Sequence, residues 1–469
     1  MNSLLQNIYW KAPHIVKNIM ASLNSRMLER QRFGTDYEKK LREIAERDTW
    51  RAEQFMDYQQ QELCRLVRHA AARVPYYRKQ FSDQGIDPAS IRGSADLPLL
   101  PILEKPAVRV DPLSFVDETL DHSSLSIAHT SGTTGTPLDL YRNVELWSTQ
   151  FAYWDARCRK IAGMQRRRNK SVTLGGHLVT EPKRTRPPFW VYNMRWNQLY
   201  MSSYHLAPEY MKHYIAELKK FNPEYIEGIA SSVYALARFI VEEKIEPVPL
   251  KACFTTCETL FDYQREAIAA AFCCRTYNQY GAGEEVVFAA ECRQGAMHLS
   301  PDVGILEVVD QNNSPVPAGE TGELICTSLI NFVQPFIRYR IGDIGALGTQ
   351  PCICGSPLPV LARIEGRIDD VLITRDGRRV GRLDPVFKGT RGVVEAQIIQ
   401  DDYDKFRVRV VPSETYSDND GKEICANLLE RIGKGDIQIE IVPRIERSAG
   451  GKFKTVLQNM PAADKQAAR

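Results

Sequence analysis

The chain has 469 residues, of which 43% are apolar, 9% aromatic and 25% charged, a composition typical of a folded globular protein and far from that of a disordered one. Its 61 Lys and Arg residues are nearly balanced by 58 Asp and Glu residues, and a net charge of +3 is too small to predict nucleic-acid binding as the main function. We therefore expect a small-molecule partner and no nucleic acid.

The first 25 residues combine Leu, Ile, Val, Tyr and Trp with Lys11 and Lys17, a mixture compatible with an amphipathic helix. We expect this segment to pack on the protein itself, with membrane contact as the less favoured alternative. The sequence contains no run of 18 consecutive apolar residues, so we expect no membrane span. The 11 cysteines are odd in number and irregularly spaced, and no secretory leader pattern precedes them, so we expect a cytoplasmic protein.

Helices and strands alternate in the middle of the chain, after a charged helical region at 36–81 and a proline-rich extended stretch at 97–101. We expect helices at 208–221, 231–241 and 262–272, and strands at 225–227, 253–256 and 276–280. This alternation predicts a parallel sheet covered by helices, with a ligand site at the carboxyl ends of its strands.

Strand patterns dominate after residue 300, with period-two segments at 304–310 and 322–327. Past residue 366, short strands flank an Asp376-Gly377 turn, and a helix at 422–432 precedes a strand at 437–442. We therefore predict an α/β protein with a large N-terminal domain at 1–365 and a small, mobile α+β C-terminal domain at 366–469. Within the large domain we expect a helical region at about 1–95 and a β subdomain at about 300–365.

The strongest local motif is the loop at 130–137 (Thr-Ser-Gly-Thr-Thr-Gly-Thr-Pro), which combines glycines with hydroxyl side chains. Such a loop lets backbone N–H groups and hydroxyl donors approach a polyphosphate closely. It is not a Walker P-loop, because no Gly-Lys-Ser/Thr ending follows. A flexible surface turn is the alternative interpretation.

Four further motifs follow this loop in a characteristic order. They are 278–284 (Asn-Gln-Tyr-Gly-Ala-Gly-Glu), 339–343 (Tyr-Arg-Ile-Gly-Asp), 366–369 (Gly-Arg-Ile-Asp) and 450–452 (Gly-Gly-Lys). Together the five motifs resemble those of the adenylate-forming, acyl-CoA synthetase-like superfamily. The chain is most similar to its phenylacetate-coenzyme A ligase family, in particular the branch associated with capsular polysaccharide biosynthesis. That resemblance implies a two-domain enzyme that uses ATP to convert a carboxylic acid into an acyl-AMP and pyrophosphate.

The resemblance also implies roles for individual residues. ATP-binding roles fall on Thr130, Ser131, Gly132, Thr133, Thr134, Gly135, Tyr280, Gly281, Asp343, Arg367 and Glu258. Lys452 corresponds to the catalytic lysine, with Lys454 as the runner-up, and Asp369 to the hinge. Glu284 corresponds to the magnesium ligand, with Glu285 as the second candidate.

The residue types suit the chemistry, because a carboxylate that attacks the α-phosphorus brings two negative charges together, and Mg²⁺ and a placed cation must offset them. One position departs from the family pattern: Gly283 stands where a Thr or Ser usually precedes the glutamate. An alternative for Asp343 is an ion pair with Arg338 or Arg340.

A second set of residues predicts a structural zinc site. Cys292, His298, Cys352 and Cys354 supply three thiolates and one imidazole, the ligand set of a closed tetrahedral site. Part of the family looks similar at these positions. Buried cysteines without a metal are the alternative.

The acceptor of the acyl group is left open. Coenzyme A, or the pantetheine thiol of a carrier protein, is the first hypothesis, and an amine or hydroxyl acceptor is the second. A nucleotide-binding homologue without activity is the third. The basic run Arg166-Arg167-Arg168 is expected to be a solvated loop, with phosphate or coenzyme A contact as the alternative, and the aromatic residues at 189–196 either line the acid pocket or pack in the core.

Overall fold

The computed structural model describes residues 8–34, 36–130, 138–176, 178–181, 184–367, 372–375, 379–380, 383–387, 390, 392–447 and 453–460. Several predicted site residues lie outside these ranges, namely Ser131, Gly132, Thr133, Thr134, Gly135, Asp369 and Lys452. Of Arg367 only the backbone is described. Their assigned roles stay predictions.

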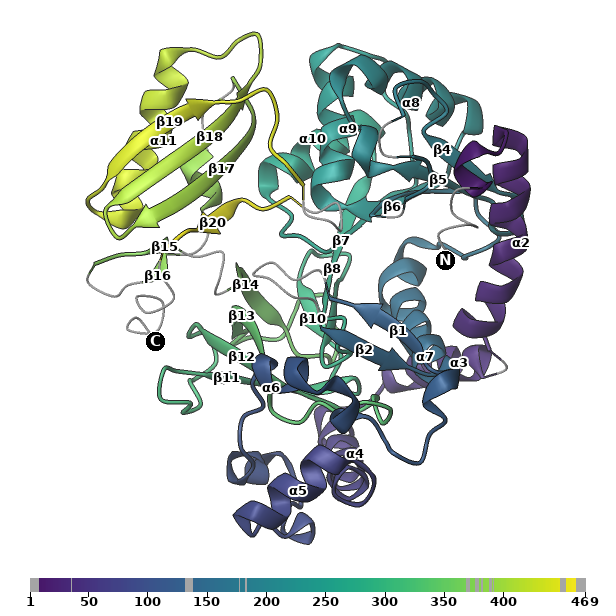
Figure 1. The fold of residues 1–469 in the computed structure, drawn as a ribbon, viewed down its shortest axis with the longest axis vertical. Coiled ribbons are helices and arrows are strands. Elements are labelled where there is room, and N and C mark those ends of the chain that lie inside the picture. Colours follow the sequence, from purple (N-terminus) through teal and green to yellow (C-terminus); the bar gives the residue numbers. More distant parts are fainter. Residues whose placement is uncertain are drawn as a thin grey trace.

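The N-terminal part of the chain is helical, as expected (Figure 1). Its helices are α2 (His14–Arg32), α3 (Tyr37–Arg47), α4 (Ala52–Arg73), α5 (Pro75–Gln84) and α6 (Lys105–Val110), with 3-10 turns at Pro88–Ser90, Ser94–Leu99, Pro112–Phe115 and His122–Ser124. Helix α2 packs along an edge strand, where Asn18 Oδ1 accepts a hydrogen bond from the backbone N–H of Tyr192 (2.9 Å). The N-terminal segment thus covers a sheet edge that would otherwise expose unpaired N–H groups.

An eight-stranded sheet lies at the centre of the protein, in the order β10-β9-β8-β7-β6-β3-β5-β4. The strands are β3 (Ser171–Gly175), β4 (Trp190–Asn193), β5 (Gln198–Ser202), β6 (Tyr225–Ile229), β7 (Ala252–Thr256), β8 (Arg275–Gly281), β9 (Phe288–Glu291) and β10 (Met297–Leu299). Strands β5, β3, β6, β7 and β8 run parallel to one another, whereas β4 pairs antiparallel with β5, β9 with β8, and β10 with β9. The predicted parallel sheet is confirmed.

Helices cover both faces of this sheet. On one face lie α8 (Pro208–Phe221), α9 (Ala230–Glu242) and α10 (Asp262–Phe272), whose apolar residues share a buried core with the sheet. On the other lie α7 (Val144–Tyr153), a π-helical turn at Trp154–Arg159 and a 3-10 turn at Lys160–Ala162. Further 3-10 turns occupy Met194–Trp196 and Ser203–His205. The observed bounds of α8, α9 and α10 agree with the predicted helices to within one residue.

A four-stranded antiparallel sheet forms the β subdomain, in the order β11-β12-β13-β14. Its strands are β11 (Gly304–Val309), β12 (Gly322–Ser328), β13 (Tyr339–Leu347) and β14 (Leu361–Arg367). A separate two-stranded hairpin, β1 (Ser126–His129) and β2 (Asp139–Arg142), flanks the loop at 131–137. The strands predicted at 304–310 and 322–327 are therefore present.

The C-terminal part has a sheet and a core of its own, drawn at the upper left of Figure 1. Its elements are β15 (Leu372–Ile373), β16 (Arg379–Val380), a 3-10 turn at Asp384–Phe387, β17 (Val393–Asp402), β18 (Lys405–Pro412), α11 (Asp418–Ile432), β19 (Asp436–Ile441) and β20 (Val456–Gln458). Strands β17 to β20 form one four-stranded sheet in the order β19-β18-β17-β20. The predicted boundary at 366 falls at the end of β14, and the mobility of the C-terminal part stays a prediction.

Across the described residues, no helix combines the length and the apolar composition needed to cross a membrane.

Candidate active site and metal centre

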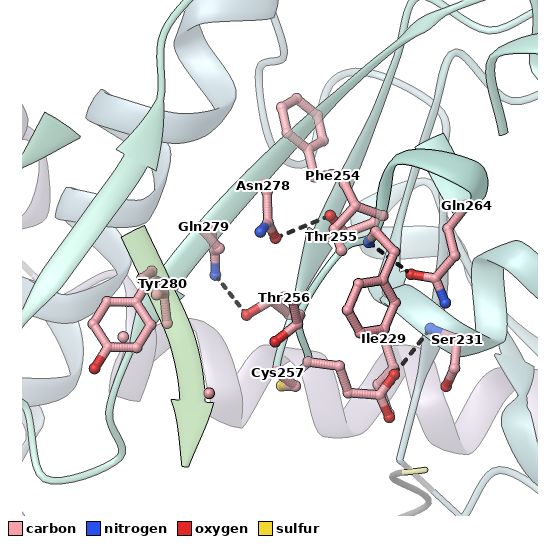
Figure 2. Close-up of a pocket in the computed structure, with 18 of the residues that line it drawn as sticks. Ile229, Ser231, Phe254, Thr255, Thr256, Cys257, Gln264, Asn278, Gln279 and Tyr280 are labelled. Carbon is pink, nitrogen blue, oxygen red and sulfur yellow. Dashed lines mark hydrogen bonds between the residues drawn. The ribbon is translucent and has the colours of Figure 1, made fainter. Parts of the chain in front are cut away.

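A cavity of about 1900 Å³ opens at the carboxyl ends of β6, β7 and β8, the edge at which parallel α/β sheets bind ligands. Figure 2 shows its wall: Thr255 and Thr256 of β7 lie beside Asn278 and Gln279 of β8, and Tyr280 lies beyond them. Gln279 Nε2 donates to Thr256 Oγ1 (3.3 Å). The β subdomain and the segment at 453–456 complete the lining.

Tyr280 and Asp343, 63 residues apart in the chain, meet in this cavity. The Tyr280 hydroxyl donates to Asp343 Oδ2 at 2.7 Å. Burial and then the Asp343 carboxylate raise the pKa of Tyr280 well above its ordinary value, so the phenol keeps its proton. Arg338 and Arg340, the alternative partners considered for Asp343, form ion pairs with Glu307 (2.9 Å) and Glu104 (2.8 Å).

The two candidate magnesium ligands have different surroundings. Glu284 is buried, and its Oε1 accepts a hydrogen bond from the Tyr339 hydroxyl (2.9 Å) and lies 4.0 Å from Lys105 Nζ. Glu285 is paired with Arg142 (3.0 Å). Burial raises the pKa of Glu285 to about 7, although Arg142 acts to lower it. Because Arg142 already holds Glu285, Glu284 is the better candidate.

The backbone at Gly283 is also in contact with Arg142. The Arg142 Nη2 group donates to the Gly283 carbonyl, and a Cβ at Gly283 would lie 3.2 Å from Leu140 Cδ1. A Thr or Ser at this position would therefore require Leu140 to shift slightly. Arg142 and Lys105 both line the cavity and were missed by the sequence analysis; neither lies in a recognisable motif.

The loop at 131–137 is closed by Thr130, which lines the cavity. The Thr130 backbone N–H donates to the Leu138 carbonyl (3.1 Å), and Thr130 Oγ1 accepts from the Leu138 N–H (2.9 Å). These two bonds extend the β1–β2 pairing to the loop ends, and Thr130 places one of the two ends at the cavity.

Glu258 binds backbone groups from both parts of the chain. Its Oε2 accepts from the Ser231 N–H at the start of α9 (2.9 Å), and its Oε1 accepts from the Phe453 N–H (2.7 Å). Phe453 directly follows Lys452, so Glu258 fixes the chain next to the predicted catalytic lysine. Contact of Glu258 with ATP stays a prediction.

Arg166, expected in a solvated loop, is instead buried in an ion network. Its Nε lies 3.1 Å from Asp155 and its Nη1 lies 3.3 Å from Glu227, while Arg159 Nε lies 3.0 Å from Glu227. Burial acts to raise the pKa of Glu227, but Arg166 and Arg159 outweigh it and lower the value to about 2. The expectation of a solvated loop is wrong for Arg166, whose partners lie 11 and 61 residues away in the sequence, whereas Arg167 and Arg168 are exposed, as expected.

The aromatic run packs in the core. Phe189 and Trp190 belong to the core shared with α8 and α9, and Trp196 is 2% exposed. None of these three aromatic residues is among the described residues that line the cavity.

The four predicted zinc ligands lie together. Their ligand atoms are all within 4.8 Å of one another: Cys292 follows β9, His298 is in β10, and Cys352 and Cys354 are in the β13–β14 loop. Cys292 Sγ and Cys352 Sγ are 3.8 Å apart, and Cys354 Sγ is 3.3 Å from His298 Nε2. His298 Nδ1 is 2.9 Å from the Leu358 carbonyl, which fixes Nδ1 as the donor and leaves Nε2 facing the sulfurs.

Backbone N–H groups also point at the sulfurs. Gln294 N–H donates to Cys292 Sγ (3.3 Å), Cys354 N–H to Cys352 Sγ (3.4 Å) and Ser356 N–H to Cys354 Sγ (3.4 Å). Hydrogen bonds of this kind stabilise the thiolate form that binds metal.

The fold is similar to that of solved adenylate-forming CoA ligases. A solved 2-hydroxyisobutyryl-CoA ligase in its postadenylation state, in complex with 2-HIB-AMP, superposes with a TM-score of 0.68 at 21% identity, over 90% of this chain and 93% of that one. The same ligase in its thioesterification state gives a TM-score of 0.55 at 22% identity.

Sequence comparisons point to the same group of proteins. Residues 372–459 match the family model of the CapK C-terminal domain. The chain is 27% identical to Protein CapK from Staphylococcus aureus, over 97% of this chain and 100% of that protein. It is also 27% identical to phenylacetate-coenzyme A ligase from Thermus thermophilus, over 88% of this chain and 98% of that protein. The resemblance inferred from the motifs is confirmed, and the comparisons support an adenylate-forming ligase and hence an enzyme.

Proposed function

We propose that this protein is an ATP-dependent, AMP-forming carboxylate ligase that transfers the activated acyl group to coenzyme A or a pantetheine thiol. The observation that carries the proposal is the Tyr280–Asp343 hydrogen bond, which lies in the same cavity as buried Glu284. Thr130, at one end of the predicted phosphate-binding loop, also lines this cavity. The full-length likeness to a phenylacetate-coenzyme A ligase supports the same reaction class.

In the first step, a carboxylate oxygen attacks the α-phosphorus of ATP, the bond to the β-phosphate breaks, and pyrophosphate leaves. Asp343 would accept hydrogen bonds from the ribose hydroxyls, with the Tyr280 ring beside adenine. The loop at 130–135 would bind the phosphates, and Lys452 would offset the charge between carboxylate and phosphate.

The residues present fit a magnesium ion. Glu284 offers a buried carboxylate oxygen, the type of ligand that Mg²⁺ prefers. Its Oε1 bond to Tyr339 orients the carboxylate and leaves Oε2 for a cation. A magnesium ion bound there would supply positive charge against the phosphate oxygens.

In the second step, the acceptor thiol attacks the acyl carbon, the bond to AMP breaks, and the thiol proton leaves. An amine or hydroxyl acceptor, giving an amide or ester, is the alternative, and a likeness to Protein CapK is compatible with such a role in polysaccharide synthesis. Single-turnover reactions of the acyl-AMP with coenzyme A or with amines separate the two.

Acid-dependent exchange of pyrophosphate into ATP tests the first step. We expect Lys452→Ala to lower the exchange rate by about 10²–10³, because it removes a placed charge. Lys219→Ala, at an exposed ion pair with Glu246, is the control. A larger loss with Lys454→Ala than with Lys452→Ala would transfer the catalytic role to Lys454. ATP binding without exchange for any acid would favour the inactive homologue.

The Cys and His cluster is proposed to hold a structural zinc ion. Zinc–sulfur bonds of about 2.3 Å in tetrahedral geometry place two sulfurs about 3.8 Å apart, and Cys292 and Cys352 have this separation, 3.8 Å. We expect one tightly bound zinc per chain after dialysis, lost in Cys352→Ser and kept in Cys273→Ser, an exposed cysteine outside the cluster. Absence of zinc from the wild-type protein would end the proposal.

A further inference from the structure

The cavity extends past the Tyr280 and Glu284 region to a polar floor. Tyr200, Thr173 and Glu227 stand side by side on β5, β3 and β6, and all three line the cavity. Gln198 Nε2 donates to Thr173 Oγ1 (2.5 Å). Phe254 continues the row on β7. The chemistry proposed for adenylate formation uses none of these polar groups.

The charges around this floor do not balance. Three guanidinium groups, of Arg32, Arg159 and Arg166, line it together with Glu227, and Asp155 lies behind Arg166. Glu227 and Asp155 account for the ion pairs of Arg159 and Arg166. Among the residues that the structure describes, no carboxylate lies within 4.0 Å of Arg32. One positive charge is therefore left over at this end of the cavity.

Ring contacts and a hydrogen bond hold the Arg32 side chain in place. It is the last residue of α2, and its guanidinium lies 5.0 Å from the ring centre of Phe151 and 5.4 Å from that of Trp196. It also hydrogen-bonds to Tyr200. Burial first, and then the nearby Arg166, lower the pKa of Arg32, so the site carries an electrostatic cost that an anion would relieve.

Arg166 adds an unused donor. Its side chain is 10% exposed, and its Nη2 is buried without a hydrogen-bond acceptor. A buried cationic N–H without an acceptor is costly, and an anion bound in the cavity would offset that cost through its charge. Arg32 and Arg166 repel each other across the same space.

From this geometry we propose that the floor of the cavity binds a second anionic group at the far end of the substrate acid, so that the acid activated is a dicarboxylate or a comparably anionic molecule. The inference rests on the proposed ligase function and specifies its substrate class. A purely apolar acyl chain would leave the Arg32 charge without a partner, and such sites reject analogues that lack the matching group.

Pyrophosphate exchange over paired acids tests the proposal. The panel contains linear dicarboxylates of three to eight carbons, the monocarboxylate of each length and the matching ω-hydroxy acid. We expect at least one dicarboxylate to exceed its monocarboxylate by about tenfold or more in kcat/KM. Arg32→Met should reduce this ratio by about ten- to a hundredfold, and Arg32→Lys should restore part of it.

Arg26→Met, an exposed arginine on the same helix, is the matched control and should keep the ratio. A wild-type preference for monocarboxylates or hydroxy acids would overturn the proposal, as would equal losses for both acids in Arg32→Met. Calorimetric titration of the same dicarboxylates without ATP tests the anion site separately from the ligase function. Dicarboxylate binding that Arg32→Met abolishes, with no exchange for any acid, would overturn the ligase function and keep the anion site. Absence of dicarboxylate binding by the wild type would overturn the anion site itself.

Discussion

The two faces of the eight-stranded sheet are both covered by helices, yet their chemistry differs. Val172, Ile226 and Cys253 are fully buried under the helices α8, α9 and α10. One residue further along two of these strands, Thr173 and Glu227 face the opposite side and line the cavity. A sheet needs only an apolar face to be stable, and buried charges add a desolvation cost. This second face also has an apolar core, formed with α7, so its charged residues are an addition that the anion site proposed above would explain.

Removal of the Glu227 carboxylate should destabilise the ion network on the polar face of the sheet. We expect Glu227→Ala to lower the free energy of unfolding by about 3–5 kcal/mol, because two buried guanidinium groups, of Arg159 and Arg166, lose their shared partner. Urea denaturation measures this loss. Glu227→Gln keeps the shape and should lose less. A loss below about 1 kcal/mol for Glu227→Ala would show that the network adds little to stability.

A matched change on the apolar face gives the comparison. Ile226→Ala should cost about 3 kcal/mol through lost burial and the cavity it leaves. Its effect should be the same at pH 7 and pH 4, since no charge is involved, and it should keep the ratio of dicarboxylate to monocarboxylate activity. A change in that ratio would mean that the two faces are coupled.

The pH dependence of stability should separate the faces further. The pKa of Glu227 is about 2 in the folded protein against 4.5 ordinarily. A carboxyl group with a lowered pKa stabilises the fold above its unfolded pKa and loses this contribution as pH falls through the folded one. The contribution, about 3 kcal/mol, should therefore be complete above pH 5 and decline below about pH 4.5. Urea midpoints of wild type and Glu227→Gln should converge in that range, and parallel curves would contradict the assignment.

Local patterns predicted most of this sheet. Helix periodicity and strand alternation over 208–281 placed α8, α9 and α10 to within one residue, because these signals depend on neighbours in the sequence. The proximity of Cys292, His298, Cys352 and Cys354 was predicted from their ligand types and from the family resemblance, and the structure brings the four together. Tyr280 and Asp343 were assigned through family motifs, not through physics, and the structure brings them together.

The polar face could not be predicted in the same way. Arg166 lies in a run of three arginines, the usual pattern of a solvated loop, and its burial depends on Asp155 and Glu227. Arg32 reaches the cavity only because α2 packs along β4 and ends beside Tyr200. Such contacts are tertiary, so no local pattern records them.

The smallest expected effect comes from the hydroxyl that joins the strands of the polar face. Thr173 Oγ1 donates to Glu227 Oε1 (3.2 Å) and accepts from Gln198 (2.5 Å). Thr173→Val keeps the volume and removes both bonds, and we expect a loss of about 1 kcal/mol in the free energy of unfolding. Thr173→Ser, which keeps the hydroxyl, is the control. Because Gln198 would keep only its longer bond to Glu227 Oε1 (3.3 Å) beside the proposed anion site, the dicarboxylate ratio should fall by about two- to fivefold in the Val variant. An unchanged ratio with lowered stability would limit Thr173 to a structural role and place the anion contacts on the arginines alone.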